Sequence, residues 1–128
     1  MKALLALPLL LFVVPAAPAE TSERPSGRMV LDEVWDGLRR YRAEKEPRKR
    51  VAYLEKLAPT RDPRVAVAMG EFLFWANAPE DLVSVGVLMA RYFLPQPVGG
   101  ARIKQFEAAV DWWRANEADL RRRAEQLP

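Results

Sequence analysis

The residues that could carry chemistry in this 128-residue chain are carboxylates, arginines, lysines and tryptophans, because the sequence contains no cysteine and no histidine. Disulfide bonds, metal sites built from thiolate or imidazole, and Ser-His or Cys-His catalysis are therefore excluded. A histidine proton shuttle near neutral pH is excluded for the same reason. Any catalysis would have to use carboxylate or lysine chemistry.

Glu71 is the carboxylate with the most unusual surroundings, because Met69, Phe72 and Leu73 flank it in an apolar segment. Burial would raise its pKa and make it a candidate general acid. An ion pair with Arg91 on the next predicted helix would instead make it structural. A hydrolase with paired carboxylates needs two acids that converge in a cleft, and the spacing predicts no such pair. We therefore expect a solvated or ion-paired Glu71, no catalytic residue, no metal ligand and no cofactor.

Trp112 and Trp113 are neighbours, and adjacent residues on a helix point about 100° apart. Trp113 continues an apolar stripe with Ile103, Phe106 and Val110, so we expect it to be buried. Trp112 should lie at the edge of the core, where it could contact a protein partner, as tryptophan often does at interfaces. The favoured alternative is that Trp112 covers a junction between helices.

A basic segment spans residues 39–50, where seven Lys and Arg side chains outnumber Glu44 and Glu46. Such a segment could bind anionic lipid headgroups, phosphate polymers or acidic envelope glycans. The candidate anion-binding residues are Arg39, Arg40, Arg42, Arg48, Lys49 and Arg50. The favoured alternative is that they form ordinary solvated helix faces.

The first 19 residues are typical of a secretory signal peptide. Lys2 gives a positive start, residues 3–14 are almost wholly apolar, and the small residues Ala17 and Ala19 precede the expected cleavage point. A membrane anchor is the alternative, but the apolar run is short for a span and contains three prolines. The mature chain would begin at Glu20 with 109 residues and a net charge of +2, in the periplasm or outside the cell. Export makes nucleic acid an unexpected partner.

The elements that must position these residues are helices, because apolar residues recur at helical spacing from Arg28 onward. Residues 20–27 carry no large apolar side chain and are expected to be a disordered lead-in. The apolar stripes and proline positions predict five helices, at residues 28–45, 47–58, 63–76, 79–94 and from about 103 to near the end. The sequence thus predicts an all-α fold, with residues 28–128 in a single domain.

Three local features refine this prediction. The first helix shows an apolar stripe that includes Val34, Trp35 and Leu38. Asp62 precedes a first-turn proline, so its side chain should cap the third helix. The last helix should bend near Asn116 rather than end there. For residues 63–94 a buried β-hairpin is the alternative, but each apolar run exceeds ten residues without a turn signal.

The segment from Tyr53 to Leu73 contains a Leu-x-x-Leu helix end, a short turn with Asp62-Pro63, and a second helix rich in small residues. This arrangement resembles a HEAT-type repeat, and the resemblance extends over residues 53–94. It implies antiparallel helix pairs, an α-solenoid fragment used for protein contacts, and no catalytic residue. Stacked repeats usually need three or more units. We therefore expect the last helix either to cap the stack or to leave an apolar face open for a partner.

Three functional hypotheses follow. The first is an exported helical module that contacts another protein and has no catalytic activity. The second is a binder of anionic lipid or envelope glycan through the basic segment. The third, and least favoured, is a carboxylate-dependent hydrolase that uses Glu71.

Overall fold

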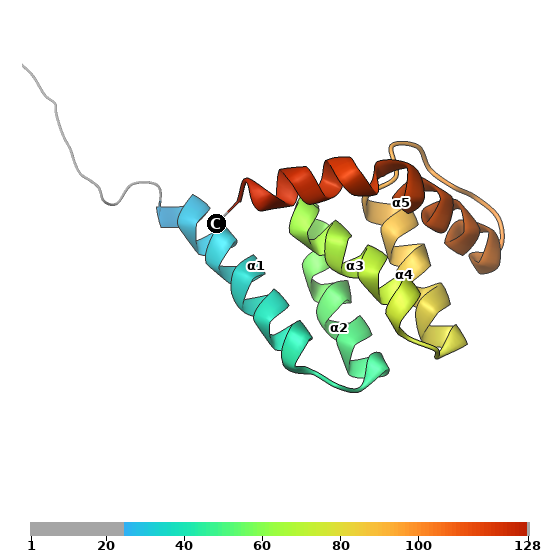
Figure 1. The fold of residues 1–128 in the computed structure, drawn as a ribbon, viewed down its shortest axis with the longest axis horizontal. Helices are drawn as coiled ribbons and strands as arrows, with labels where there is room; N and C mark the ends of the chain where they lie inside the picture. The colour runs from blue at the N-terminus through green and yellow to red at the C-terminus, as the bar shows by residue number, and fades with distance from the viewer. Residues whose placement is uncertain (1–24, 128) are drawn as a thin grey trace, which may run out of the picture. The chain divides into compact units, whose positions relative to one another are not determined.

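The computed structural model describes the backbone of residues 25–127 and the side chains of residues 33–127. The predicted leader and residues 20–24 of the predicted lead-in lie outside the described residues. Within them, all regular secondary structure is helical (Figure 1), and the all-α prediction is confirmed. The elements are α1 (Pro25–Ala43), α2 (Pro47–Leu57), the 3-10 turn η2 (Ala58–Thr60), α3 (Pro63–Trp75), α4 (Pro79–Tyr92) and α5 (Arg102–Glu125).

The chain divides into two units, residues 1–33 and 34–128, and the buried side chains of the described core belong to the second. The start of α1 at Pro25 corrects the sequence prediction, which had assigned residues 25–27 to a disordered lead-in. Proline suits the first turn of a helix, where its missing N–H group is no loss. For the same reason Pro47, Pro63 and Pro79 begin the next three helices.

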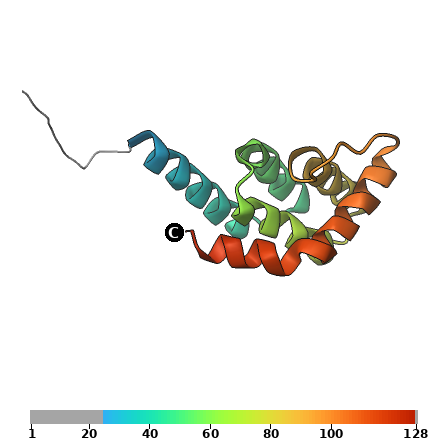
Figure 2. The same ribbon diagram turned by 90° about the horizontal axis from the view of Figure 1, so that it is seen from above.

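The core of the unit beginning at Val34 forms where α2, α3, α4 and α5 meet. α2 packs on α4, α3 packs on both, and α5 packs along α3 and α4 (Figure 2). The fully buried side chains include Leu54, Met69, Phe72, Val85 and Met89. α3 and α4 supply most of the buried residues, which agrees with their almost continuous apolar sequences.

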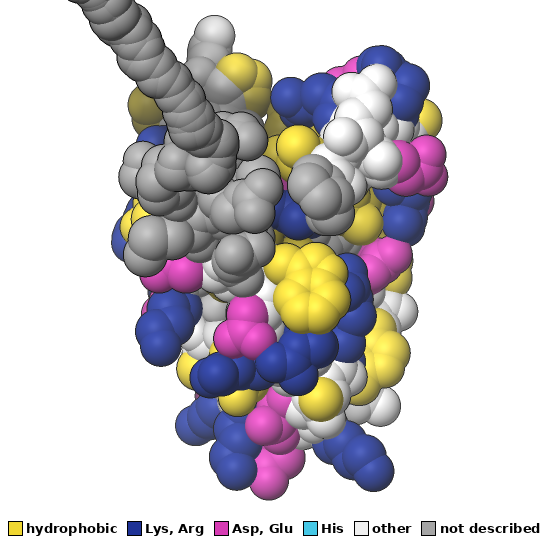
Figure 3. All heavy atoms as spheres, turned by 90° about the vertical axis from the view of Figure 1, so that its left-hand side faces the viewer, with side chains coloured by type: hydrophobic (Ala, Val, Ile, Leu, Met, Phe, Trp, Pro, Cys, Tyr) yellow, Lys and Arg dark blue, Asp and Glu magenta, His cyan; other side chains and the backbone are white. Residues whose placement is uncertain are grey.

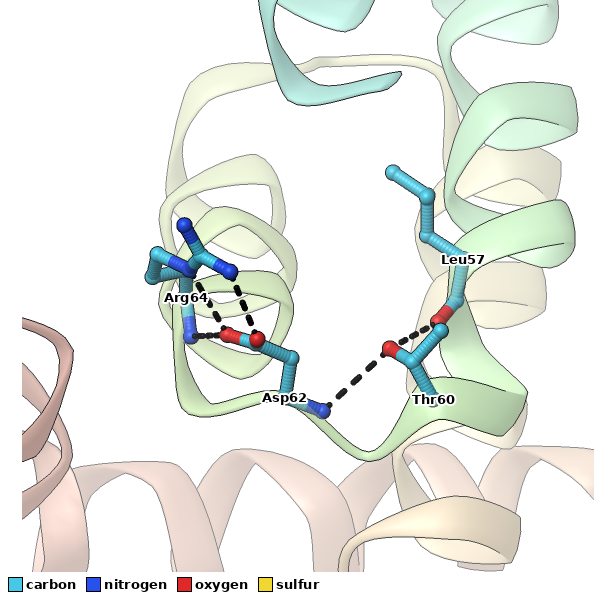
Figure 4. A network of polar contacts seen from close by, with 4 residues as sticks. All are labelled: Leu57, Thr60, Asp62 and Arg64. Carbon is cyan, nitrogen blue, oxygen red and sulfur yellow. Dashed lines mark hydrogen bonds and ion pairs between the residues drawn. The ribbon is translucent and has the colours of Figure 1, made fainter. Parts of the chain in front are cut away.

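The turn between α2 and α3 is held by a polar network, drawn in Figure 4. The Thr60 hydroxyl donates to the Leu57 carbonyl at 2.7 Å, and the Asp62 N–H donates to the Thr60 hydroxyl at 3.3 Å. The Asp62 carboxylate accepts from the Arg64 N–H at 2.8 Å, so the predicted cap is confirmed. Arg61 adopts the left-handed conformation, with φ 53°, that turns the chain into α3.

α5 is continuous from Arg102 to Glu125, and it changes direction part-way along, as Figures 1 and 2 both show. The Asn116 side-chain amide donates to the Trp112 carbonyl at 2.8 Å, one turn earlier in the helix. Asparagine side chains that bond to the helix backbone compete with its regular ladder. Among the described helices, none combines the length and apolarity that a membrane crossing requires.

Candidate functional site

Trp113 is buried, with 2% of its surface exposed, as the sequence predicted. Its indole ring lies on Gly70 of α3, where a Cβ atom would overlap the ring. Gly70 therefore allows α5 to approach α3 closely at this point. Trp112 is half-buried and packs against the core, at the edge position predicted for it. Its possible contact with a partner stays a prediction.

Glu71 is exposed and forms an ion pair with α5. Its carboxylate lies 2.8 Å from the Arg121 guanidinium, which also pairs with Glu117 at 2.9 Å. The alternative pairing with Arg91 is therefore wrong, because the partner comes from α5 rather than α4. Arg121 also stacks on the Trp113 ring, 5.6 Å from its centroid. The Glu71 side chain is 56% exposed, so it does not have the buried surroundings that its apolar neighbours in the sequence suggested.

The first two residues of the candidate anion-binding set share one carboxylate on their own helix. Arg39 and Arg40 both pair with Asp36, one turn earlier in α1. The Arg39 hydrogen bond lowers the pKa of the Asp36 carboxyl below its ordinary value. Arg39 also stacks on Trp35, 5.7 Å from the ring centroid.

Two further members of the set lie at the start of α2 and also face carboxylates. Arg48 approaches Glu80 at 3.7 Å and Asp81 at 3.8 Å, both in the first turn of α4. Lys49 pairs with Glu46 at 3.8 Å. Apart from Asp81, which is 14% exposed, these side chains are largely exposed, and ion pairs between exposed side chains contribute little to stability.

Arg50, the last member of the set, packs against two aromatic rings. Its guanidinium lies between the rings of Tyr41 and Trp75, 4.5 Å and 4.3 Å from their centroids. It also donates to the Glu44 carbonyl at 2.8 Å and to the Arg42 carbonyl at 3.2 Å. Arg50 thus joins the end of α1 to the start of α2 and the end of α3. Its Nε and Nη2 groups donate to the backbone.

The six candidate residues therefore do not gather into one surface of uncompensated positive charge. Figure 3 shows acidic side chains next to basic ones over this face of the molecule. Of the set, Arg42 is the member whose guanidinium has no carboxylate partner and no aromatic stacking partner among the described residues. The sequence could not show this, because half of the neutralising acids come from α4.

Four large apolar side chains are about half exposed, and for Trp35 and Ile103 this corrects the apolar stripes predicted from the sequence. Trp35 is 55% and Phe74 56% exposed, and Trp75 and Ile103 are similar. Val34 and Leu38 define the buried side of α1, and Trp35, next to Val34, points about 100° away from it. The predicted stripe of this helix includes Trp35 together with Val34 and Leu38. The angle of about 100° between adjacent residues already indicates that Trp35 cannot face the same side as Val34.

Two depressions lie along α3 and share Arg121. The first has a volume of about 310 Å³, and the second has a volume of about 430 Å³. The first is lined by Trp35, Leu38, Arg42, Arg64, Val67, Arg121, Ala124, Glu125 and Leu127. The second is lined by Gly70, Glu71, Phe74, Trp113, Arg114, Glu117 and Arg121. We call the two together the α3 trough, because α3 and α5 contribute to both, and α1 lines the first.

The α3 trough combines exposed aromatic side chains with charged ones. Its acids Glu71 and Glu117 share one arginine, Arg121. Among the described side chains, no group of three or more acidic residues could hold a metal ion. What the trough offers is a half-exposed aromatic side chain in each depression and guanidinium groups around them.

Comparison with models of protein families, with curated protein sequences and with solved structures found no match to this chain.

Proposed function

We propose that this chain is an exported helical module that binds another protein and has no catalytic activity of its own. The observation that carries this proposal is the α3 trough, with Trp35 in one depression and Phe74 in the other. Exposed aromatic side chains beside a hollow are typical of protein-binding surfaces, where tryptophan and arginine contribute most of the affinity. Export rests on the predicted signal peptide, and the determined N-terminus of the mature protein should be Glu20.

The paired helices support a relation to HEAT-type α-solenoids, in which stacked helices present an extended binding surface. In this proposal α2 and α3 form the repeat-like pair, α4 packs beside them, and α5 covers part of the stack. The order of elements and the contacts of α2, α3 and α4 are compatible with such an arrangement.

The two competing functions have weaker support. An anionic lipid or glycan would meet a segment in which Asp36, Glu46, Glu80 and Asp81 already pair with the basic side chains. A hydrolase would need a poised carboxylate, whereas Glu71 is exposed and ion-paired.

Affinity capture from an envelope extract of the source organism tests the proposal. The bait is the mature protein, and the comparison is between wild type, a Trp35→Ala/Phe74→Ala variant and Ile103→Ala. Ile103 is as exposed as the two aromatic residues but lies outside the trough, so it is a matched control. Wild type and Ile103→Ala should recover the same protein, and the double variant should lose it. Equal recovery by all three, or recovery by none, contradicts the proposal.

A further inference from the structure

The floor of the α3 trough is a single stripe of α3. Arg64, Val67, Glu71 and Phe74 follow one another at spacings of three and four residues, so they lie along one side of the helix. At 1.5 Å per residue this stripe is about 15 Å long, which is close to three helical turns. The trough is therefore long enough to hold a helical segment along its whole length.

The walls of the trough come from the two flanking helices. On one side α1 contributes Trp35, Leu38 and Arg42, at spacings of three and four residues. On the other side α5 contributes residues from Trp113 to Glu125. A bound segment would lie on α3 and against α5 along both depressions, and would contact α1 in the first one. This geometry matches the mode in which an amphipathic helix inserts its apolar side into a groove.

The charges of the trough indicate which flanks of such a helix would carry acids. Arg64 is bonded to Asp62, and Arg121 to Glu71 and Glu117, so these two cations are already neutralised. Arg42 on the α1 wall and Arg114 on the α5 wall have no carboxylate partner among the described residues, and Arg114 stacks on Phe74. In the described part of the chain, the acids that line the trough do not pair with these two arginines: Glu71 and Glu117 pair with Arg121, and Glu125 forms no ion pair with either. Each wall thus presents a cation to the space above α3.

We propose that the α3 trough binds an amphipathic helix of a partner protein whose apolar stripe faces Val67 and Phe74. Acidic residues on both flanks of that stripe would pair with Arg42 on α1 and with Arg114 on α5. This inference rests on the proposed function and adds to it the site and the chemistry of the partner. The two depressions, of about 310 and 430 Å³, would receive its apolar side chains.

Selection of displayed random peptides of about 16 residues, long enough for four helical turns, tests this proposal on the mature protein. Enriched peptides should carry apolar residues at helical spacing with Asp or Glu on both sides of the stripe. A synthetic copy of the most enriched peptide is then titrated by fluorescence anisotropy. Phe74→Ala should weaken its binding about tenfold or more, in line with the loss of an aromatic anchor.

Charge variants separate this mode of binding from general attraction between charges. Arg42→Glu and Arg114→Glu should each weaken the peptide, and raising the salt concentration should weaken wild-type binding. Arg91→Glu removes an exposed arginine outside the trough and should leave the affinity unchanged, as should Ile103→Ala. Circular dichroism would reveal whether Phe74→Ala fails to fold. In that case the loss of peptide affinity in Arg42→Glu and Arg114→Glu tests the proposal on its own.

Several results would overturn the proposal. Enriched peptides that lack acids, or that bind Phe74→Ala and Arg42→Glu as well as wild type, would place recognition elsewhere while the protein-binding function could still stand. Self-association that Phe74→Ala abolishes would assign the trough to a second copy of the chain. If no peptide is enriched, the trough binds no such helix. Capture of no partner from the extract as well would contradict the proposed function itself.

Discussion

The indole ring of Trp113 in α5 lies directly on Gly70 of α3, in the space that a Cβ atom at position 70 would occupy. The next residue along α3, Glu71, pairs with Arg121, and Arg121 stacks on the same indole ring. One crossing point therefore combines a close backbone approach, a buried aromatic ring and an exposed ion pair. It fixes the position of α5 on α3 and with it one wall of the trough.

Gly70→Ala should destabilise the protein by about 1–3 kcal/mol, the usual cost of overpacking a well-packed site. The added methyl group would meet the Cε2, Cδ2 and Cζ2 atoms of Trp113, so the ring would have to move. This loss should outweigh the roughly 1 kcal/mol by which alanine favours a helix over glycine. Urea denaturation measures the change in the free energy of unfolding.

Gly99→Ala is the matched control, because a Cβ atom at Gly99 would meet no atom within 4 Å. Its effect should stay within about 0.5 kcal/mol, as for other surface substitutions. A Gly70→Ala/Trp113→Leu double variant should show a smaller loss than the sum of the two single variants, since the smaller side chain leaves room for the methyl group. Additive losses would contradict the role given to this contact.

The sequence predicted the two helices that cross here, but it did not predict which of their residues are in contact. Helical phase within α5 placed Trp113 in the core, and proline and aspartate positions predicted where α3 begins. Phase within one helix does not tell which residue of another helix it meets, so neither Gly70 nor the Arg121 partner of Glu71 could be identified. For the same reason the sequence could not show that Arg48 of the basic segment has carboxylate partners, since these come from α4.

Arg50→Ala should destabilise the protein by roughly 1–3 kcal/mol, the combined scale of two stacking contacts and hydrogen bonds from a charged donor. Arg50→Lys should recover only part of this loss, because an ammonium group lacks the planar fork that spans two rings and two carbonyls. Thermal unfolding of wild type and both variants checks this order of stability, with Arg50→Lys between the other two. Arg42→Ala is the control from the same segment and should have little effect, because its guanidinium has no carboxylate or aromatic partner among the described residues. If Arg50→Ala proves as mild as this control, Arg50 would be free for ligands after all.

Tyr41 should make the stability of the protein fall at alkaline pH. Burial raises the pKa of its hydroxyl to about 12, and the hydroxyl donates to the Ala68 carbonyl at 3.3 Å. In the unfolded chain a tyrosine loses its proton near pH 10, so above that pH the folded state is the one that retains it. Stability is therefore unaffected by this group below about pH 10 and falls by up to about 1.4 kcal/mol per pH unit between 10 and 12.

Tyr41→Phe is the variant that isolates this effect. It removes the hydroxyl, so its stability should decline less between pH 10 and 12 than that of wild type, although it loses roughly 1 kcal/mol at neutral pH with the hydrogen bond. Urea denaturation at a series of pH values provides the comparison. Parallel pH profiles for the two proteins would show that Tyr41 titrates normally in the folded state.

Asp62 should stabilise α3 both as a helix cap and through its charge. Partial burial opposes its ionisation, but the hydrogen bonds and charge of Arg64 outweigh this and hold the pKa of Asp62 below its ordinary value. The folded state therefore keeps the carboxylate charged where the unfolded chain would take up a proton. Its contribution is complete above the unfolded pKa near 4 and is lost as the pH falls through the lower folded pKa.

Replacements at Asp62 can separate the cap from the ion pair. Asp62→Ala removes both and should cost about 1–2 kcal/mol at pH 7, since loss of a cap alone typically costs about 1 kcal/mol. Asp62→Asn keeps a good capping side chain and should cost less. Because asparagine does not take up a proton at acid pH, the stability of this variant should fall less on acidification than that of wild type. Because Arg64 lines the trough and its position depends on Asp62, Asp62→Ala should also weaken the selected peptide, whereas Gly99→Ala should not. Equal stability of the alanine and asparagine variants at pH 7, with unchanged peptide affinity, would show that the cap orders neither α3 nor the trough.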